Sequence, residues 1–172
     1  MFGGADGKKL LAAALLLLLA GFAVWNFAIN NKADIGIEKG EKAPDFTLSS
    51  LKDGDISLSD FKGKKVLLNF WATWCKPCKT EMPDMEKLQN DHKNFAVLAV
   101  NFTSSEKNSK AVEEFADSLD LTFSIVLDQE GINAKYGIFS YPTSFIINES
   151  GIIEDIVLGT MTKNEMEKRL GL

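Results

Sequence analysis

The sequence VLLNFWATWCKPC, residues 66–78, determines which class of fold this chain adopts. Residues 66–71 are almost continuously apolar, which is typical of a central strand buried on both faces. Trp74, Cys75, Lys76, Pro77 and Cys78 then lead into a helix predicted over 76–92. A buried strand that passes directly into a CxxC motif at the start of a helix predicts an α/β protein whose chemistry lies at that junction.

The flanking sequence alternates between strand and helix patterns. We expect a strand–turn–strand unit over 45–48 and 55–58, further strands over 95–102, 123–127, 143–147 and 151–158, and helices over 109–119, 131–136 and from Thr162 onward. Thr162 and Glu165 have the spacing of a capping box at the start of the last helix. Strands that alternate with helices predict a central mixed sheet with helices on both faces.

The CxxC motif is suited to thiol chemistry. A thiol at Cys75 would lie over the free N–H groups of the first helical turn, where the positive end of the helix dipole favours the thiolate. Cys78 lies one turn along the same face, close enough to form a disulfide. Pro77 is tolerated because first-turn N–H groups have no helical partner. We expect Cys75 to be the more exposed thiol and the nucleophile, and Cys78 to be partly shielded.

Other uses of the two cysteines fit the sequence less well. A closed zinc site needs about four ligands, and beside the cysteines the chain has one histidine, His92. Covalent haem attachment would need a histidine after Cys78, where Lys79 stands. A purely structural disulfide across so short a loop would gain little. We therefore predict a redox-active dithiol, with no metal and no cofactor.

The N-terminal segment is predicted to be a membrane anchor. Leu10 to Ile29 is twenty residues without a charge, about the length that spans a hydrocarbon core of roughly 30 Å. Lys8 and Lys9 precede it and favour a cytoplasmic N-terminus. A cleaved signal peptide is the alternative, although its apolar run is usually shorter. We predict a stub and transmembrane helix over 1–29, a linker over 30–42 and an extracytoplasmic domain over 43–172. The net charge of −5 argues against nucleic-acid binding.

Two motifs resemble proteins of the thioredoxin fold. FWATWCKPC, residues 70–78, resembles their active-site segment, and YGIFSYPT, residues 136–143, resembles the loop that carries a cis-proline opposite the dithiol. The resemblance implies that Pro142 is the cis residue and that Tyr141 offers backbone groups to an extended partner strand, with Trp74 and Pro77 also at the partner-binding surface. An ordinary turn or edge-strand proline is the alternative for Pro142.

The chain also resembles the ResA/TlpA group of tethered extracytoplasmic proteins. The features that carry this resemblance are the extra helix and strand within 103–127, the opening KAPDFTL at 42–48 and the N-terminal apolar segment. It implies reduction of disulfides in partner proteins, notably apocytochromes during c-type cytochrome maturation; some members serve spore-envelope assembly. The oxidised pair would need electrons from across the membrane, which implies a membrane thiol protein as electron donor.

One position departs from ordinary thioredoxins. Many of them have a buried Asp where this chain has Asn69, and an amide cannot act as a general base. The ResA-like group shares this Asn and has an acid at the position of Glu81, one turn beyond Cys78. We predict that Glu81 handles protons for the dithiol; the alternative is an exposed helical Glu.

Three other functions remain alternatives. A disulfide oxidase or isomerase would use the same residues in another direction. A non-catalytic module would only bind extended peptides. A peroxiredoxin-like peroxidase shares the KAPDFTL opening but uses a Thr-x-x-Cys motif, whereas Thr73 lies only two residues before Cys75.

Overall fold

The computed structural model describes residues 5–30 and 33–172, and within the first helix it describes the side chains of 9–25. The chain forms two compact units, Met1–Asp34 and Ile35–Leu172. The first unit contains one helix, α1 (Ala5–Asn30), whose described leucines are exposed. Within the described part of the chain, no helix combines the length and the apolar character that crossing a membrane requires.

The predicted anchor extends beyond what the structure describes. The side chains of Lys8 and of 26–29, at the two ends of the expected anchor, lie outside the described residues, as do positions 31 and 32 of the expected linker. Helical structure over the apolar run is confirmed. Insertion of that helix into a membrane stays a prediction.

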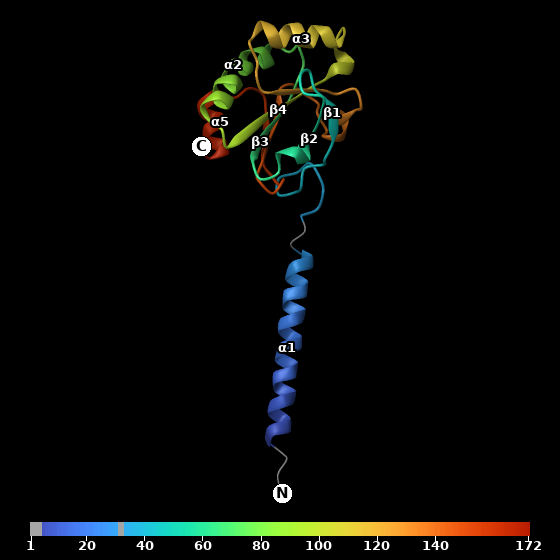
Figure 1. The fold of residues 1–172 in the computed structure, drawn as a ribbon, viewed down its shortest axis with the longest axis vertical. Coiled ribbons are helices and arrows are strands. Elements are labelled where there is room, and N and C mark those ends of the chain that lie inside the picture. The colour runs from blue at the N-terminus through green and yellow to red at the C-terminus, as the bar shows by residue number, and fades with distance from the viewer. Residues whose placement is uncertain (1–4, 31–32) are drawn as a thin grey trace. The chain divides into compact units, whose positions relative to one another are not determined.

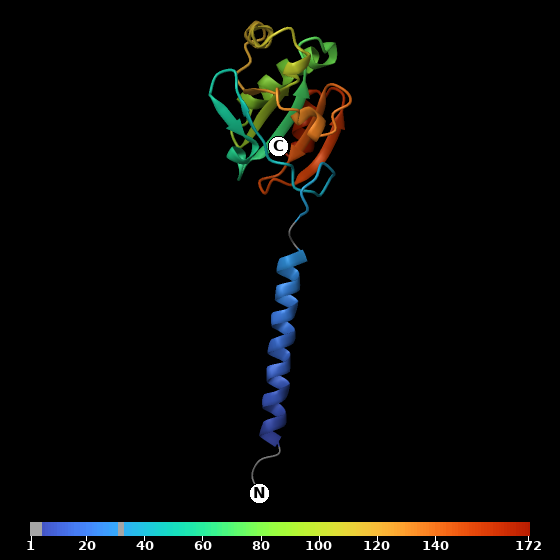
Figure 2. The ribbon, with the colours of Figure 1, turned by 90° about the vertical axis from the view of Figure 1, so that its right-hand side faces the viewer.

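The second unit is built on a five-stranded mixed sheet in the order β5-β4-β3-β6-β7. Its strands are β3 (Lys65–Trp71), β4 (Phe95–Asn101), β5 (Ser124–Leu127), β6 (Thr143–Ile147) and β7 (Ile153–Leu158). β3, β4 and β5 are parallel to one another, whereas β6 and β7 run antiparallel to their neighbours. Figure 2 shows the β6–β7 hairpin, orange to red, at one edge of the sheet. The predicted strand pair forms a separate two-stranded sheet, β1 (Thr47–Ser49) and β2 (Asp55–Ser57).

The sheet is covered on both faces, as predicted. One face packs against α2 (Lys76–Asp91), α3 (Ser109–Ser118) and α5 (Lys163–Leu170), and the other against β1–β2 and the short α4 (Ile132–Lys135). In Figure 1, α2 and α5 lie to the left of the sheet and β1–β2 to its right. Two short 3-10 helices, Leu58–Phe61 and Thr103–Ser105, complete the unit. Every strand and helix predicted within 43–172 is present with ends within two residues of those expected.

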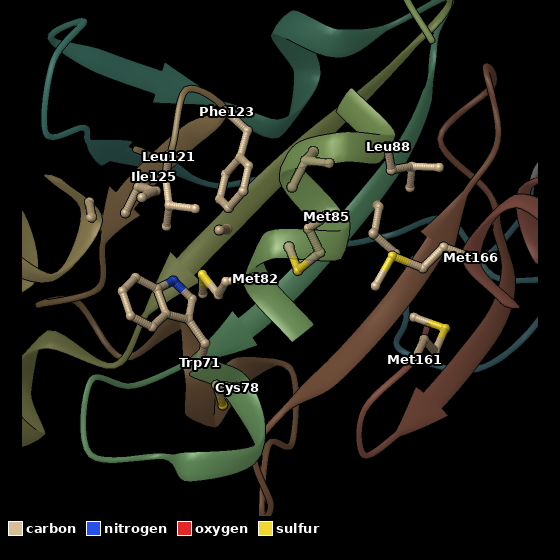
Figure 3. Packing of buried hydrophobic residues seen from close by; sticks show 14 of the residues in the cluster. Trp71, Cys78, Met82, Met85, Leu88, Leu121, Phe123, Ile125, Met161 and Met166 are labelled. Carbon is tan, nitrogen blue, oxygen red and sulfur yellow. The ribbon is translucent and has the colours of Figure 1, made fainter. Parts of the chain in front are cut away.

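The core on the α2 side reaches the CxxC motif. Trp71 at the end of β3, Cys78, and Met82, Met85 and Leu88 along α2 are all buried in one cluster. Figure 3 shows part of this cluster, with Cys78 in the first turn of α2, the helix that carries Met82 and Met85. The helix is therefore held against the sheet by its apolar stripe, which fixes its N-terminus beside the end of β3.

The domain begins earlier than predicted. Gly40 N–H donates to the carbonyl of Ile153 at 2.8 Å, and Ile153 N–H donates to the carbonyl of Glu41 at 2.9 Å. Ile37 packs against the buried cluster on the β1–β2 side. The folded domain therefore includes the residues of the expected linker from Ile35 onward, because their backbone pairs with the start of β7.

Candidate active site

Cys75 and Cys78 form a disulfide at the N-terminus of α2, with their Cα atoms 5.3 Å apart. Cys75 is the N-cap residue, and its Sγ accepts a hydrogen bond from the backbone N–H of Cys78 at 3.2 Å. A first-turn N–H group therefore points at the sulfur, as predicted, and a position at the helix N-terminus favours a thiolate at Cys75. Cys75 is 4% exposed and Cys78 1%, so both are less accessible in the disulfide form than expected, although their order agrees with the prediction.

The segment before the disulfide is held by the loop that follows β4. The Glu106 carboxylate accepts hydrogen bonds from the backbone N–H of Thr73 at 2.6 Å and from the Thr73 hydroxyl. It also accepts one from Asn101 Nδ2 at 3.0 Å. Trp74 Nε1 donates to Ser105 Oγ at 3.0 Å. The Thr73 hydroxyl is thus bound to a carboxylate, which does not favour the peroxide-positioning role that a peroxidase would need from it.

The loop of Pro142 lies beside the disulfide segment. The Tyr141–Pro142 peptide bond is cis, which confirms that expectation. The Tyr141 ring meets the Trp74 ring edge-on, with centroids 5.6 Å apart. Trp74 itself is 54% exposed. The two sequence motifs, whose contacting residues Trp74 and Tyr141 are 67 positions apart, are therefore brought together at one surface. Pairing of Tyr141 with a partner strand stays a prediction.

Glu81 is buried behind the disulfide, with 2% of its surface exposed, which rules out the alternative of an exposed helical Glu. Its Oε1 accepts from the backbone N–H of Met161 at 3.0 Å, and its Oε2 from Asn69 Nδ2 at 3.4 Å. Burial raises the pKa of Glu81 from 4.5 to about 7, with a small further rise from Asp84, against the lowering effect of the two hydrogen bonds. A carboxyl with this pKa can accept and release a proton near neutral pH.

Asn69 occupies the buried position that the sequence singled out. Its Nδ2 also donates to Ser144 Oγ at 2.9 Å, so the amide joins β3, β6 and Glu81. Its Oδ1 is buried and has no partner among the described residues. A buried, unpartnered carbonyl oxygen near Glu81 is an acceptor that a proton-bearing group could use.

Several residues at this site escaped the sequence analysis. They are Glu106, which binds Thr73; Phe102, whose ring stacks on Tyr141; and Asn133, which accepts from the Tyr141 hydroxyl. Phe102 and Glu106 flank the 3-10 helix Thr103–Ser105, Asn133 lies within α4, and no local motif marks any of them. No capping pattern points to Asn133 either, because the N-cap residue of α4 is Gly131 and Asp128 lies five positions before Asn133.

Comparisons with known proteins agree with this geometry. Residues 39–156 match the AhpC/TSA family. The chain is 56% identical over 167 residues to the thioredoxin-like protein YneN of Bacillus subtilis (strain 168), covering 96% of this chain and 98% of YneN. It is 42% identical over 163 residues to the thiol-disulfide oxidoreductase ResA of Geobacillus kaustophilus, covering 92% and 91% of the two chains.

Solved structures show the same fold. The crystal structure of StoA from Bacillus subtilis is similar with a TM-score of 0.67 and 36% sequence identity. The match covers 73% of this chain and 96% of StoA. A putative thiol:disulfide interchange protein DsbE from Chlorobium tepidum is similar with a TM-score of 0.71 and 33% identity, covering 78% and 96% of the two chains.

Proposed function

Since the chain belongs to the AhpC/TSA family and is a thiol-disulfide oxidoreductase of the thioredoxin-like type, we propose that it reduces disulfides in partner proteins. The observation that carries this proposal is the position of the Cys75–Cys78 pair at the α2 N-terminus, beside the cis-Pro142 loop. The pair is close enough to open and close as one disulfide, and its first sulfur is the one that faces the helix N–H groups.

Reduction proceeds in two exchanges. The Cys75 thiolate attacks one sulfur of the partner disulfide, so that a mixed disulfide forms and the other partner sulfur leaves as a thiolate. Cys78 then loses its proton and attacks Cys75 Sγ, which releases the second partner thiolate and restores the Cys75–Cys78 disulfide. Each cycle leaves the partner reduced by two electrons, and a donor dithiol must return those electrons to this chain.

Glu81 is suited to the proton step. A buried thiol at Cys78 stays protonated near neutral pH unless a base accepts its proton. Glu81 lies one helical turn beyond Cys78, and its pKa of about 7 matches that task. Asn69 and the Met161 N–H hold the Glu81 carboxyl in place. Because Gln cannot accept the proton, Glu81→Gln should slow resolution of the mixed disulfide and flatten its pH dependence between about pH 6 and 8.

An insulin-reduction assay tests the proposal. Full-length protein with dithiothreitol as electron source should accelerate the reduction of insulin disulfides over dithiothreitol alone. Cys75→Ala should abolish the acceleration, whereas Glu114→Gln, which changes an exposed carboxyl on α3, should keep it. A Cys75→Ala variant as active as wild type would contradict the proposal and favour a peptide-binding module.

We further propose where the protein works and with which partners. The charge-free run Leu10–Ile29 after Lys8 and Lys9 supports a tether that places the domain outside the cytoplasm. The resemblance to the ResA/TlpA group supports apocytochrome c as a partner, and a membrane thiol protein as donor. Cys78→Ala should trap partners as mixed disulfides on Cys75, and mass spectrometry of the trapped species would identify them. Recovery of cytoplasmic proteins alone would contradict the location.

A further inference from the structure

The side chain of Tyr141 packs between the rings of Phe102 and Trp74, in the segment beside the disulfide. Its ring stacks on Phe102 at 5.7 Å and 16°, and meets Trp74 edge-on at 5.6 Å and 84°. Trp74 directly precedes Cys75 and is 54% exposed. The Trp74 and Tyr141 rings therefore lie beside the reactive cysteine, where a partner segment would approach it.

A chain of hydrogen bonds through Asn133 and Asp128 holds the Tyr141 side chain in position. Its hydroxyl donates to Asn133 Oδ1 at 2.8 Å, and Asn133 is 3% exposed. Asn133 Nδ2 donates to Asp128 Oδ2 at 2.6 Å, and the Asn133 backbone N–H donates to the same oxygen at 2.7 Å. Because its amide nitrogen is bound to a carboxylate, the amide oxygen must point toward Tyr141.

The Asp128 carboxylate, which binds Asn133, is itself held in place by backbone hydrogen bonds. Its Oδ1 accepts from the backbone N–H groups of Glu130, Gly131 and Ile132 at 2.8–3.0 Å. Burial opposes ionisation, but the hydrogen bonds outweigh it and hold the pKa of Asp128 below its usual range. Burial and the Asp128 charge raise the pKa of Tyr141 to about 12, so its hydroxyl remains a donor at neutral pH.

We propose that the Tyr141 ring is a specificity determinant, held by Asn133 and Asp128 as positioning residues, that selects partner segments with an aromatic side chain beside the reactive cysteine. The inference rests on the proposed reductase function. A ring already held in one position loses little conformational freedom on binding, which favours it as a contact for a partner. Aromatic pairs interact beyond their buried area by an amount that corresponds to about two- to tenfold in rate or affinity.

The hydrogen bonds from Tyr141 through Asn133 to Asp128 would stabilise the fold even without a role in specificity. A comparison of peptide reduction rates separates stability from specificity. The probes are two synthetic peptides, each closed by one intramolecular disulfide, with Phe or Gly immediately before the first cysteine. Pre-reduced full-length protein is mixed with each peptide, and the second-order rate constant for formation of peptide dithiol and protein disulfide is measured. Exchange with oxidised glutathione, measured in parallel, reports on the dithiol alone.

We expect wild type to reduce the Phe peptide about two- to tenfold faster than the Gly peptide. Tyr141→Leu should bring the ratio of the Phe-peptide rate to the Gly-peptide rate to about one. Tyr141→Phe keeps the ring and removes only its fastening, so it should lower the ratio without abolishing it. Asn133→Leu should act like Tyr141→Phe. Tyr136→Phe removes the hydroxyl of the buried Tyr136, which is bound to the Pro44 carbonyl, and should leave the ratio unchanged.

Three results would overturn the inference. Equal rates for the two peptides in wild type would show that the protein has no preference for an aromatic residue. A preference that survives Tyr141→Leu would show that another residue causes it. A Tyr136→Phe variant that lowers the ratio as much as Tyr141→Phe would show a general effect of stability. Failure of wild type to reduce either peptide would overturn the reductase function itself, and this inference with it.

Discussion

Replacement of Glu81 by Gln should change how the stability of the protein depends on pH. Gln keeps the shape of the side chain and an oxygen that can accept from the Met161 N–H, but it cannot ionise. In wild type the buried carboxyl must lose its proton somewhere near neutral pH, at a site where burial disfavours the charge. Glu81→Gln has no carboxyl to ionise, so its folded state does not carry the free-energy cost of a buried charge at neutral pH.

The size and sign follow from the two pKa values of Glu81. Its pKa is about 7 in the folded protein and 4.5 without the fold, so the folded state binds more protons between these values. The free energy of unfolding therefore falls as pH rises from about 4.5 to 7 and stays lowered above that. A gap of about 2.5 in pKa corresponds to about 3 kcal/mol, at 1.36 kcal/mol for each tenfold change in proton affinity.

Urea unfolding of the oxidised full-length protein between pH 4.5 and 8 measures this effect. The free energy of unfolding of Glu81→Gln, relative to wild type, should rise by about 3 kcal/mol across that range. Glu114→Gln, which removes a largely exposed carboxyl, should run parallel to wild type. A difference between Glu81→Gln and wild type that varies by less than about 1 kcal/mol would refute the burial argument for this carboxyl.

Three further predictions concern thiols, topology and the Asp128 cap. Brief alkylation of the reduced protein should label Cys75 before Cys78, and equal labelling between pH 5 and 8 would argue against Cys75 as nucleophile. Protease added to intact spheroplasts should digest residues 35–172; protection until the membrane is lysed would contradict the proposed location. Asp128→Ala should lower the free energy of unfolding by about 3 kcal/mol or more, because it leaves five N–H groups without their acceptor. A loss below about 1 kcal/mol in urea unfolding would show that water replaces the carboxylate.

Local signals in the sequence predicted most of the fold. The capping box at Thr162 and Glu165 is present with both of its hydrogen bonds, because it depends only on residues within one helical turn. The apolar run 66–71 forms the central strand β3, with strands paired on both sides. Such patterns are short-range consequences of side-chain size and periodicity, so one sequence is enough to read them.

The connections that shape the site are long-range, and no local pattern reveals them. Thr73 and Glu106 are 33 residues apart, and Glu81 and Met161 are 80 apart. Whether a carboxyl such as Glu81 is buried depends on which segment packs over it. The sequence placed Glu81 one turn from Cys78, but its contact with Met161 follows only from the docking of the segment before α5.

The domain boundary failed to appear in the sequence for a related reason. Residues 35–42 are polar in composition, which is typical of a linker. Their attachment runs through backbone groups, such as Gly40 N–H to the Ile153 carbonyl, and side-chain composition carries no record of those hydrogen bonds.

The midpoint potential of the Cys75–Cys78 couple tests the proposed reductase direction most directly. The full-length protein would be equilibrated in dithiothreitol buffers of graded ratio, and its reduced fraction measured by thiol alkylation and mass. A reductase should have a potential well below about −180 mV, since its dithiol must give electrons to partner disulfides. A potential at or above about −180 mV would contradict the proposal and identify the protein as a disulfide oxidase or isomerase.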